Sequence, residues 1–149
     1  MSASKRPNEE ACRLPAGGPP EEVVAKILAL RVIAVVGISP KAERPSHYVS
    51  EYLQEHGYKI VPVNPGHQEI LGETCWPSVA DIPFPIDVVA VFRRSEEALA
   101  PILEAIAKKA QAVWLQDGVH HDEGERAARA AGLLVVANDC LMRRHARRG

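Results

Sequence analysis

The chain has 149 residues, the size of one typical domain, and 46% of its residues are hydrophobic while 25% are charged. These fractions match soluble globular proteins and argue against wholesale disorder or a fibrous repeat. The formal charge of -1 provides no general basic field that would attract nucleic acid or an anionic membrane, so any anion site must be local.

The cysteines, Cys12, Cys75 and Cys140, are widely spaced and form no C-x-x-C pair, which fits a reducing compartment better than a disulfide framework or a zinc site. No apolar run reaches about 18 residues, and the polar N-terminus lacks the pattern of a signal peptide. We therefore expect a cytoplasmic protein with no membrane span.

The first 20 residues hold four of the twelve prolines and few large apolar side chains, a composition that predicts a flexible leader. Residues 21–149 are expected to form one domain. It begins with a short helix over 21–30, which has acidic residues in its first turn, where the helix dipole favours them.

Short apolar runs then alternate with segments of helical periodicity. The expected strands are residues 32–36, 59–63, 87–92, 112–115 and 133–136. The expected helices are residues 45–56, 95–106 and 122–131. The proline-rich segment 70–85 is expected to cross over with a short helical turn near 78–81.

Ser95 is expected to be the N-cap of the helix over 95–106, with a buried stripe of Leu99, Ile102, Leu103 and Ile106. Pro101 inside this segment predicts a kink or a late start. For the next helix, Asp122 and Glu125 have the spacing of a capping box.

This alternation predicts an α/β fold, a Rossmann-like, doubly wound, five-stranded and mainly parallel sheet of order 3-2-1-4-5 with helices on both faces. In such sheets ligands bind outside the carboxyl ends of the strands, where the strand order reverses. The loops after the first four strands are therefore the places to search for a site.

The loop after the first strand is well supplied for an anion. Gly37 lets backbone approach a ligand, Ser39 and Ser46 offer hydroxyl groups, and Arg44 brings charge just before the start of a helix, whose free N–H groups favour phosphate. The alternative is an ordinary strand-to-helix turn with solvated charges. The loop is neither a G-x-G-x-x-G fingerprint nor a P-loop.

The second strand ends at Asn64, followed by Pro65 and His67. A dinucleotide-binding fold that uses NAD usually places an acidic residue here to hold the ribose diol, and Asn64 is not acidic. His67 is placed to meet a phosphate. These residues count against NAD and leave NADP or coenzyme A.

The third strand ends in Arg93 and Arg94, whose fork-shaped donors suit phosphate, although Glu96 and Glu97 are alternative partners for them. After the fourth strand, Gln116 and Gly118 come where the chain passes the expected cleft, while Trp114 is expected in the core.

The chain resembles the small CoA-binding domain family, relatives of the N-terminal domain of the succinyl-CoA synthetase alpha subunit, from about residue 24 to residue 144. Spaced matches in the right order carry the resemblance: G-x-S followed by Arg44-Pro45-Ser46, Gly57-Tyr58, Pro62-Val63-Asn64-Pro65, Leu71-Gly72, Asp81-Ile82-Pro83, Asp87, Phe92-Arg93-Arg94-Ser95-Glu96, Trp114-Leu115-Gln116-Asp117-Gly118 and Asp139-Cys140.

The resemblance implies that coenzyme A is held with its pyrophosphate near the first loop and its adenosine end near the second strand. Residues implied to face phosphates are Gly37, Ser39, Arg44, Pro45 and Ser46; those implied to flank the adenosine end are Asn64, Pro65 and His67. Those implied to line the middle are Phe92, Arg93 and Arg94, with Gln116 and Gly118 near the pantetheine. The phosphorylated histidine of the synthetase lies in a second domain, so its ligase reaction is not expected here.

Three further features of the sequence are candidates for chemistry or contacts. Cys140 is a candidate redox thiol that would exchange disulfides with coenzyme A, although the favoured interpretation is a buried small hydrophobic residue. The run from His120 to Glu123 is interpreted as a solvated loop with a helix cap, so no metal is predicted. The basic run 143–148 is either a solvated helix end or a contact for the cleft or an acidic partner.

The leading hypothesis is a coenzyme A or acyl-CoA binding protein that acts as a carrier, sensor or regulatory module, because the loops show no clear nucleophile and general-base pair. The first alternative is an NADP-dependent oxidoreductase-like domain. The second is a subunit of a larger acyl-CoA enzyme that has lost ligand binding. Partners other than the small molecule are left open between a second copy of the chain and such an enzyme.

Overall fold

The computed structural model describes residues 19–148, and its main sheet has five parallel strands. They are β1 (Val32–Val36), β2 (Lys59–Val63), β5 (Val88–Val91), β6 (Ala112–Leu115) and β7 (Leu134–Val136). The expected Rossmann-like α/β sheet is confirmed, and each predicted strand matches an observed one to within a residue at either end. The expected leader falls, except for residues 19 and 20, outside the described residues.

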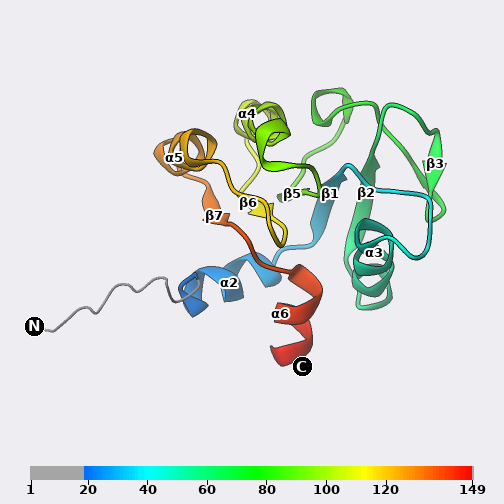
Figure 1. The fold of residues 1–149 in the computed structure, drawn as a ribbon, viewed down its shortest axis with the longest axis horizontal. Helices are drawn as coiled ribbons and strands as arrows, with labels where there is room; N and C mark the ends of the chain where they lie inside the picture. Colours follow the sequence, from blue (N-terminus) through cyan, green and yellow to red (C-terminus); the bar gives the residue numbers. More distant parts are fainter. Residues whose placement is uncertain (1–18, 149) are drawn as a thin grey trace, which may run out of the picture.

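Helices cover both faces of this sheet (Figure 1). One face carries α2 (Glu21–Leu28), α3 (Pro45–Glu55) and α6 (Leu141–Arg148), and the other carries α4 (Leu99–Ala107) and α5 (Asp122–Ala130). Because successive strand residues point to opposite faces, Ile33 and Val35 pack in the first layer while Ala34 and Val36 pack in the second. The sheet is therefore doubly wound, with an apolar core on each side.

The strand order differs from the expected 3-2-1-4-5 in the place of the third strand: the sheet runs β2-β1-β5-β6-β7, which is 2-1-3-4-5 in chain order. The Asp87 carboxylate accepts the N–H groups of Arg31 at 3.2 Å and Val32 at 3.0 Å, which fixes the start of β5 beside β1. The outer edge of β2 is bonded to Trp76 instead, through the Pro62 carbonyl and the Asn64 N–H. The connection from β2 to β5, the third strand, thus crosses over β1.

The crossover from β2 to β5 contains a small antiparallel pair, β3 (Glu69–Ile70) and β4 (Glu73–Thr74), and the 3-10 turn η1 (Val79–Asp81). The turn near 78–81 was predicted. The β3-β4 pair was not, because each of its strands has only two residues. Its turn has positive φ at Leu71 and Gly72, 55° and 75°, the geometry of a tight hairpin.

The start of α4 is a correction to the prediction. Ser95 opens a separate 3-10 turn, η2 (Ser95–Glu97), and its hydroxyl accepts the His120 N–H and donates to the Gly118 carbonyl, so it ties two loops together and does not cap α4. The late start places Pro101 in the first turn of α4, where a missing N–H costs little. Leu103, expected to be buried, is 47% exposed.

The cap of α5 lies one residue earlier than predicted. His121 is the N-cap: its Nδ1 accepts the Gly124 N–H at 3.0 Å, and Glu125 accepts the His121 N–H at 2.8 Å. The reciprocal arrangement of a capping box is present, but His121 takes the place expected of Asp122.

Candidate functional site

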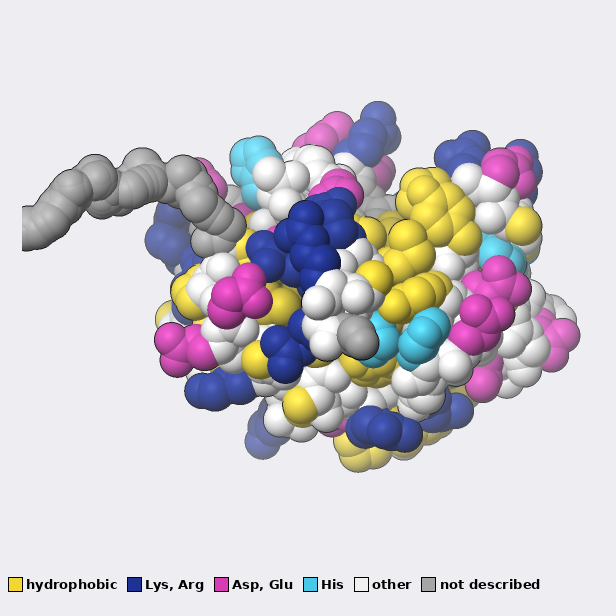
Figure 2. All heavy atoms as spheres, turned by 90° about the horizontal axis from the view of Figure 1, so that it is seen from below, with side chains coloured by type: hydrophobic (Ala, Val, Ile, Leu, Met, Phe, Trp, Pro, Cys, Tyr) yellow, Lys and Arg dark blue, Asp and Glu magenta, His cyan; other side chains and the backbone are white. Residues whose placement is uncertain are grey.

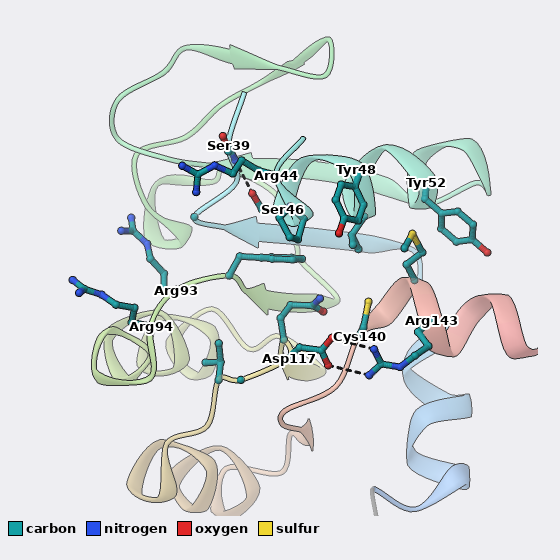
Figure 3. Close-up of a pocket in the computed structure, with 18 of the residues that line it drawn as sticks. Ser39, Arg44, Ser46, Tyr48, Tyr52, Arg93, Arg94, Asp117, Cys140 and Arg143 are labelled. Carbon is teal, nitrogen blue, oxygen red and sulfur yellow. Dashed lines mark hydrogen bonds and ion pairs between the residues drawn. The ribbon is translucent and has the colours of Figure 1, made fainter. Parts of the chain in front are cut away.

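A cleft of about 990 Å³ opens at the carboxyl ends of the central strands, where order reverses between β1 and β5 (Figure 3). Its walls come from the loop after β1, the start and outer face of α3, the loops after β5 and β6, and the segment that leads into α6. This is the position at which open α/β sheets bind ligands.

Gly37 makes the floor of the cleft possible. Its φ is +85°, and a Cβ built on it would lie 2.5 Å from the carbonyl oxygen of Phe92, closer than any side chain tolerates. Only glycine combines this backbone conformation with this close approach, so the loops after β1 and β5 meet without an intervening side chain.

The rest of the loop after β1 is held by hydrogen bonds to its own neighbours. The Ser46 hydroxyl is buried and accepts the Ser39 N–H at 2.9 Å, and the Ser39 hydroxyl accepts the Lys41 N–H at 3.1 Å. Asn64 donates from Nδ2 to the Ile38 carbonyl at 2.8 Å. Both serine hydroxyls and the Asn64 amide therefore shape the loop, and the exposed N-terminal turn of α3 is left facing the cleft with no side-chain cap.

Arginine side chains concentrate at one end of the cleft (Figure 3). Arg94 is 74% exposed and pairs with Glu96 at 3.8 Å and Glu97 at 3.4 Å, as the alternative interpretation of the sequence had it. Within residues 19–148, neither Arg44 nor Arg93 has a carboxylate in ion-pair distance. Their positive charges are uncompensated there, so this end is suited to an anionic ligand.

The segment leading into α6 and the first turn of α6 supply a further wall, which the basic run 143–148 indicated only as one of its interpretations. Arg143 binds Asp117 through two hydrogen bonds, at 2.9 and 3.0 Å, and also donates to Asp139 at 2.9 Å. Arg144 binds Asp139 at 2.8 Å and also pairs with Glu21. The hydrogen bonds to Asp117 and Asp139 raise the pKa of Arg143 above its ordinary value, but its charge is already neutralised by these carboxylates.

Asp139 is the centre of this network and is 5% exposed. Burial alone would raise its pKa, but hydrogen bonds from Arg144, from the Cys140 N–H and from Arg143, with the charge of Arg144, hold the pKa below its usual range. Its backbone carbonyl accepts the Trp114 Nε1–H at 2.9 Å, and Trp114 is fully buried, as expected. Asp139 therefore joins α6, through its carboxylate, to β6, through its backbone carbonyl.

Gln116 and Cys140 lie between the two ends of the cleft. Gln116 is 5% exposed, and its Oε1 accepts the Leu141 N–H at 3.3 Å. Because that bond fixes which end of the amide is oxygen, the Nε2 donor is left for another acceptor, and within residues 19–148 it has none. The Cys140 thiol lines the cleft but is 7% exposed, so it is both a cleft residue and a largely buried small side chain.

The structure brings most of the predicted site residues to this one cleft. They are Gly37, Ser39, Arg44, Pro45, Ser46, Phe92, Arg93, Arg94, Gln116, Gly118 and Cys140. Asn64, Pro65 and His67 are not in the lining; Pro65 and His67 are exposed beyond β2.

The lining also contains residues that sequence reasoning missed: Tyr48, Val49, Tyr52, Asp117, Val119, Met142, Arg143 and Ala146. Contact with the cleft is one interpretation of the basic run 143–148, and Asp117 lies between Gln116 and Gly118, which the sequence predicts in the site. Tyr48 and Tyr52 carried no signal, because an aromatic residue in an amphipathic helix is ordinarily read as core.

One group outside the cleft has ligand atoms close enough for a metal ion: His120, Asp122 and Glu125, within 4.8 Å of one another. The Glu125 carboxylate is occupied as the partner of the His121 N–H and lies 3.9 Å from Arg129. This group is accounted for by the cap of α5. Among residues 19–148, no helix is long and apolar enough to cross a membrane.

A doubly wound parallel sheet with a cleft at its strand-order reversal defines a Rossmann-like ligand-binding domain. The chain belongs to the CoA binding domain family, whose sequence profile matches residues 31–146. This confirms the resemblance to the CoA-binding domain family that the sequence showed. The comparisons add a relationship to the CoA-binding domain of ADP-forming acetyl-CoA synthetases, a succinyl-CoA synthetase-like family.

Individual relatives agree with this assignment. The uncharacterized protein YneT of Bacillus subtilis is 40% identical over 76% of this chain and 84% of its own length. Acetate--CoA ligase [ADP-forming] II of Archaeoglobus fulgidus is 29% identical over 64% of this chain, but only 15% of the ligase is covered. The solved structure of a hypothetical protein from Pyrococcus horikoshii OT3 superposes with a TM-score of 0.84 at 44% identity, covering 87% of this chain and 92% of that one.

Proposed function

We propose that the chain binds coenzyme A or an acyl-CoA in the cleft and serves as a carrier, sensor or regulatory module. The observation that carries the proposal is the division of one cleft into a cationic end, with Arg44 and Arg93 uncompensated within residues 19–148, and an apolar end between α3 and α6. Coenzyme A is divided in the same way: its phosphates are anionic, and its pantetheine arm leads to a thiol.

The residues present fit this ligand. Arg44 and Arg93 offer charge-assisted donors to phosphate oxygens, and the start of α3, which no side chain caps, adds the positive end of its helix dipole. Farther along the cleft, the Nε2 of Gln116 is a fixed donor for an amide carbonyl of the pantetheine arm. The bound group would supply a thiol or thioester; the chain's own residues hold the phosphates and align the arm.

A binding role is also supported by how the cleft's hydroxyl groups are used. The Ser39 and Ser46 hydroxyls accept backbone N–H groups of their own loop. Tyr52 bonds His145 at the wall between two helices, at 2.9 Å. These bonds hold structural elements together, and in the described part of the cleft they leave no serine paired with a general base.

Isothermal titration with coenzyme A, NADP and ATP tests the proposal, together with variants of the cationic end. Arg93→Ala should weaken coenzyme A binding by about 1.5 to 3 kcal/mol, roughly ten- to hundredfold in Kd, because a charge-assisted bond is lost. Arg94→Ala should cost less, since Glu96 and Glu97 already compensate its charge. Arg126→Ala, on the exposed side of α5, is the matched control and should change nothing.

Tighter binding of NADP than of coenzyme A would overturn the proposal in favour of the oxidoreductase-like alternative. No binding of any of the three ligands would favour a subunit without a ligand. An unchanged Kd in Arg93→Ala would show that this guanidinium does not meet a phosphate.

A further inference from the structure

The end of the cleft away from Arg44, Arg93 and Arg94 contains apolar side chains from two helices, beside the Arg143 and Asp117 ion pair. From α3 come Tyr48, Val49 and Tyr52, and from α6 come Met142 and Ala146. Figure 3 shows Tyr48 and Tyr52 at the α6 side of the cleft, away from Arg93 and Arg94. Figure 2 shows hydrophobic side chains beside a group of Lys and Arg side chains on the face seen from the side of α6.

The apolar end contains an exposed large hydrophobic side chain, whereas most such side chains in residues 19–148 are buried. Tyr48 is 42% exposed, and the one other large hydrophobic side chain this exposed among residues 19–148 is Leu103, on the opposite face of the sheet. Leaving an aromatic ring in water forgoes burial energy unless a ligand covers it. The surface at Tyr48 is continuous with the cleft, so the ligand of the cleft is the group that can cover it.

The wall is held in place by contacts behind it. The Tyr52 hydroxyl bonds Nδ1 of His145 at 2.9 Å, and the Tyr52 ring stacks on His56 with centroids 4.1 Å apart. The His145 ring also packs edge-on against the rings of His56 and Tyr58, with centroids 5.0 and 5.7 Å apart. With the Arg143 and Asp117 pair on the other side, these contacts fix α6 against α3, so the apolar end is preformed.

The charge of the cleft sets the direction of the ligand. Phosphates are drawn to Arg44 and Arg93, since the charge of Arg143 at the other end is already neutralised by Asp117 and Asp139. With the phosphates there, the pantetheine arm would pass Gln116, and its sulfur would face the side of Cys140 and α6, which line the rest of the cleft. A group attached to that sulfur would then lie between α3 and α6.

We infer that the ligand is an acyl-CoA with an apolar acyl group, and that this acyl group is held between α3 and α6 against Tyr48, Tyr52 and Met142. The inference rests on the proposed function and names the class of ligand for the same cleft. A charged acyl group would lose water against these rings and Met142, and the neighbouring Arg143 is already paired with Asp117 and Asp139, so the site discriminates against it.

Titration with coenzyme A and with its acetyl, butyryl, hexanoyl, octanoyl and succinyl thioesters tests the inference. Affinity should rise about two- to fourfold with each methylene, as expected for partial to full burial, until the chain outgrows the cleft. Succinyl-CoA, which ends in a carboxylate, should bind more weakly than butyryl-CoA. If coenzyme A binds and octanoyl-CoA binds no more tightly, the inference is wrong while the proposed function stands; if neither binds, the proposed function itself fails.

A variant at the apolar end tests where the acyl group is bound. Ala146 is an exposed residue of α6 that lines the apolar end, and Ala146→Trp fills that end with a large side chain. The ratio of octanoyl-CoA affinity to coenzyme A affinity should fall at least tenfold. The control, Ala130→Trp, adds the same side chain to an exposed position on α5 and should keep the wild-type ratio. Should Ala146→Trp fail to fold, Tyr48→Ala tests the same wall. A ratio that stays at the wild-type value in a folded variant would place the acyl chain elsewhere.

Discussion

Replacing Asp139 by Asn removes the charge that holds the start of α6 to the sheet. One carboxylate oxygen accepts the Cys140 N–H at 2.8 Å and an Arg143 nitrogen at 2.9 Å, and the other accepts Arg144 Nε at 2.8 Å. The amide of Asn keeps one acceptor but presents N–H donors to the guanidinium of Arg144, which is only 14% exposed.

The cost of Asp139→Asn follows from what each arginine retains. A hydrogen bond to a charged group contributes about 1.5 to 3 kcal/mol, and breaking a buried pair costs up to about 3 to 5 kcal/mol. Arg143 keeps Asp117, and Arg144 keeps Glu21, whose side chain is 73% exposed. We therefore expect the free energy of unfolding to fall by about 2 to 4 kcal/mol at pH 7. Asp117→Asn, at a carboxylate that is 57% exposed, is the matched control and should cost less than about 1 kcal/mol.

Urea denaturation at two pH values checks this prediction. The pKa of Asp139 is lowered in the folded state, so its contribution is complete above the pKa of about 3.9 of an unfolded Asp and is lost as the pH falls through the lower folded value. The difference in free energy of unfolding between wild type and Asp139→Asn should have its full value at pH 7 and be smaller at pH 3. A gap below about 1 kcal/mol at pH 7, or an equal gap at both, would refute the reasoning.

The other predictions concern the floor, the wall and the thiol of the cleft. Gly37→Ala should lower the free energy of unfolding, measured in urea, by more than about 2 kcal/mol, because the new Cβ would lie 2.5 Å from the Phe92 carbonyl oxygen. Gly132→Ala, where φ is +90° and no atom lies within 4 Å of the added Cβ, should lower it by about 1 kcal/mol. Equal losses in the two variants would contradict the close approach at Gly37. Burial, with repulsion from His56 and Arg148, lowers the pKa of His145, so the free energy of unfolding should fall as the pH drops below about 6.5. His145→Gln should make the free energy of unfolding depend less steeply on pH in this range. An unchanged pH dependence would assign it to other groups. Bound coenzyme A should slow alkylation of Cys140, measured by peptide mass spectrometry, and leave Cys75 unaffected, because of the two cysteines in residues 19–148 it is Cys140 that lines the cleft. Equal protection of both would point to a global effect.

The strands could be predicted because they are buried on both faces and therefore stand out as β-branched runs, such as Val32–Val36. Their order could not be predicted in full, because it depends on which neighbour the start of β5 meets. That choice is made by the bonds of Asp87 to the N–H groups beside β1 and by Trp76 at the edge of β2, contacts between residues far apart in the chain.

The cationic end of the cleft was predictable for a similar reason. Arg44, Arg93 and Arg94 follow directly on strands or precede a helix, and the topology of a parallel sheet brings such positions together. The apolar end was not predictable, since Tyr48 and Tyr52 have the spacing of core residues and only the packing of α6 against α3 shows that they face a cleft.

A crystal structure of the full chain soaked with coenzyme A tests the central claim most directly. Our account predicts density for the ligand in this one cleft, with phosphates at Arg44 and Arg93, a pantetheine carbonyl at Gln116, and the sulfur on the side of Cys140 and α6. Coenzyme A bound outside the cleft, or bound with its phosphates at the α6 end, would contradict the account.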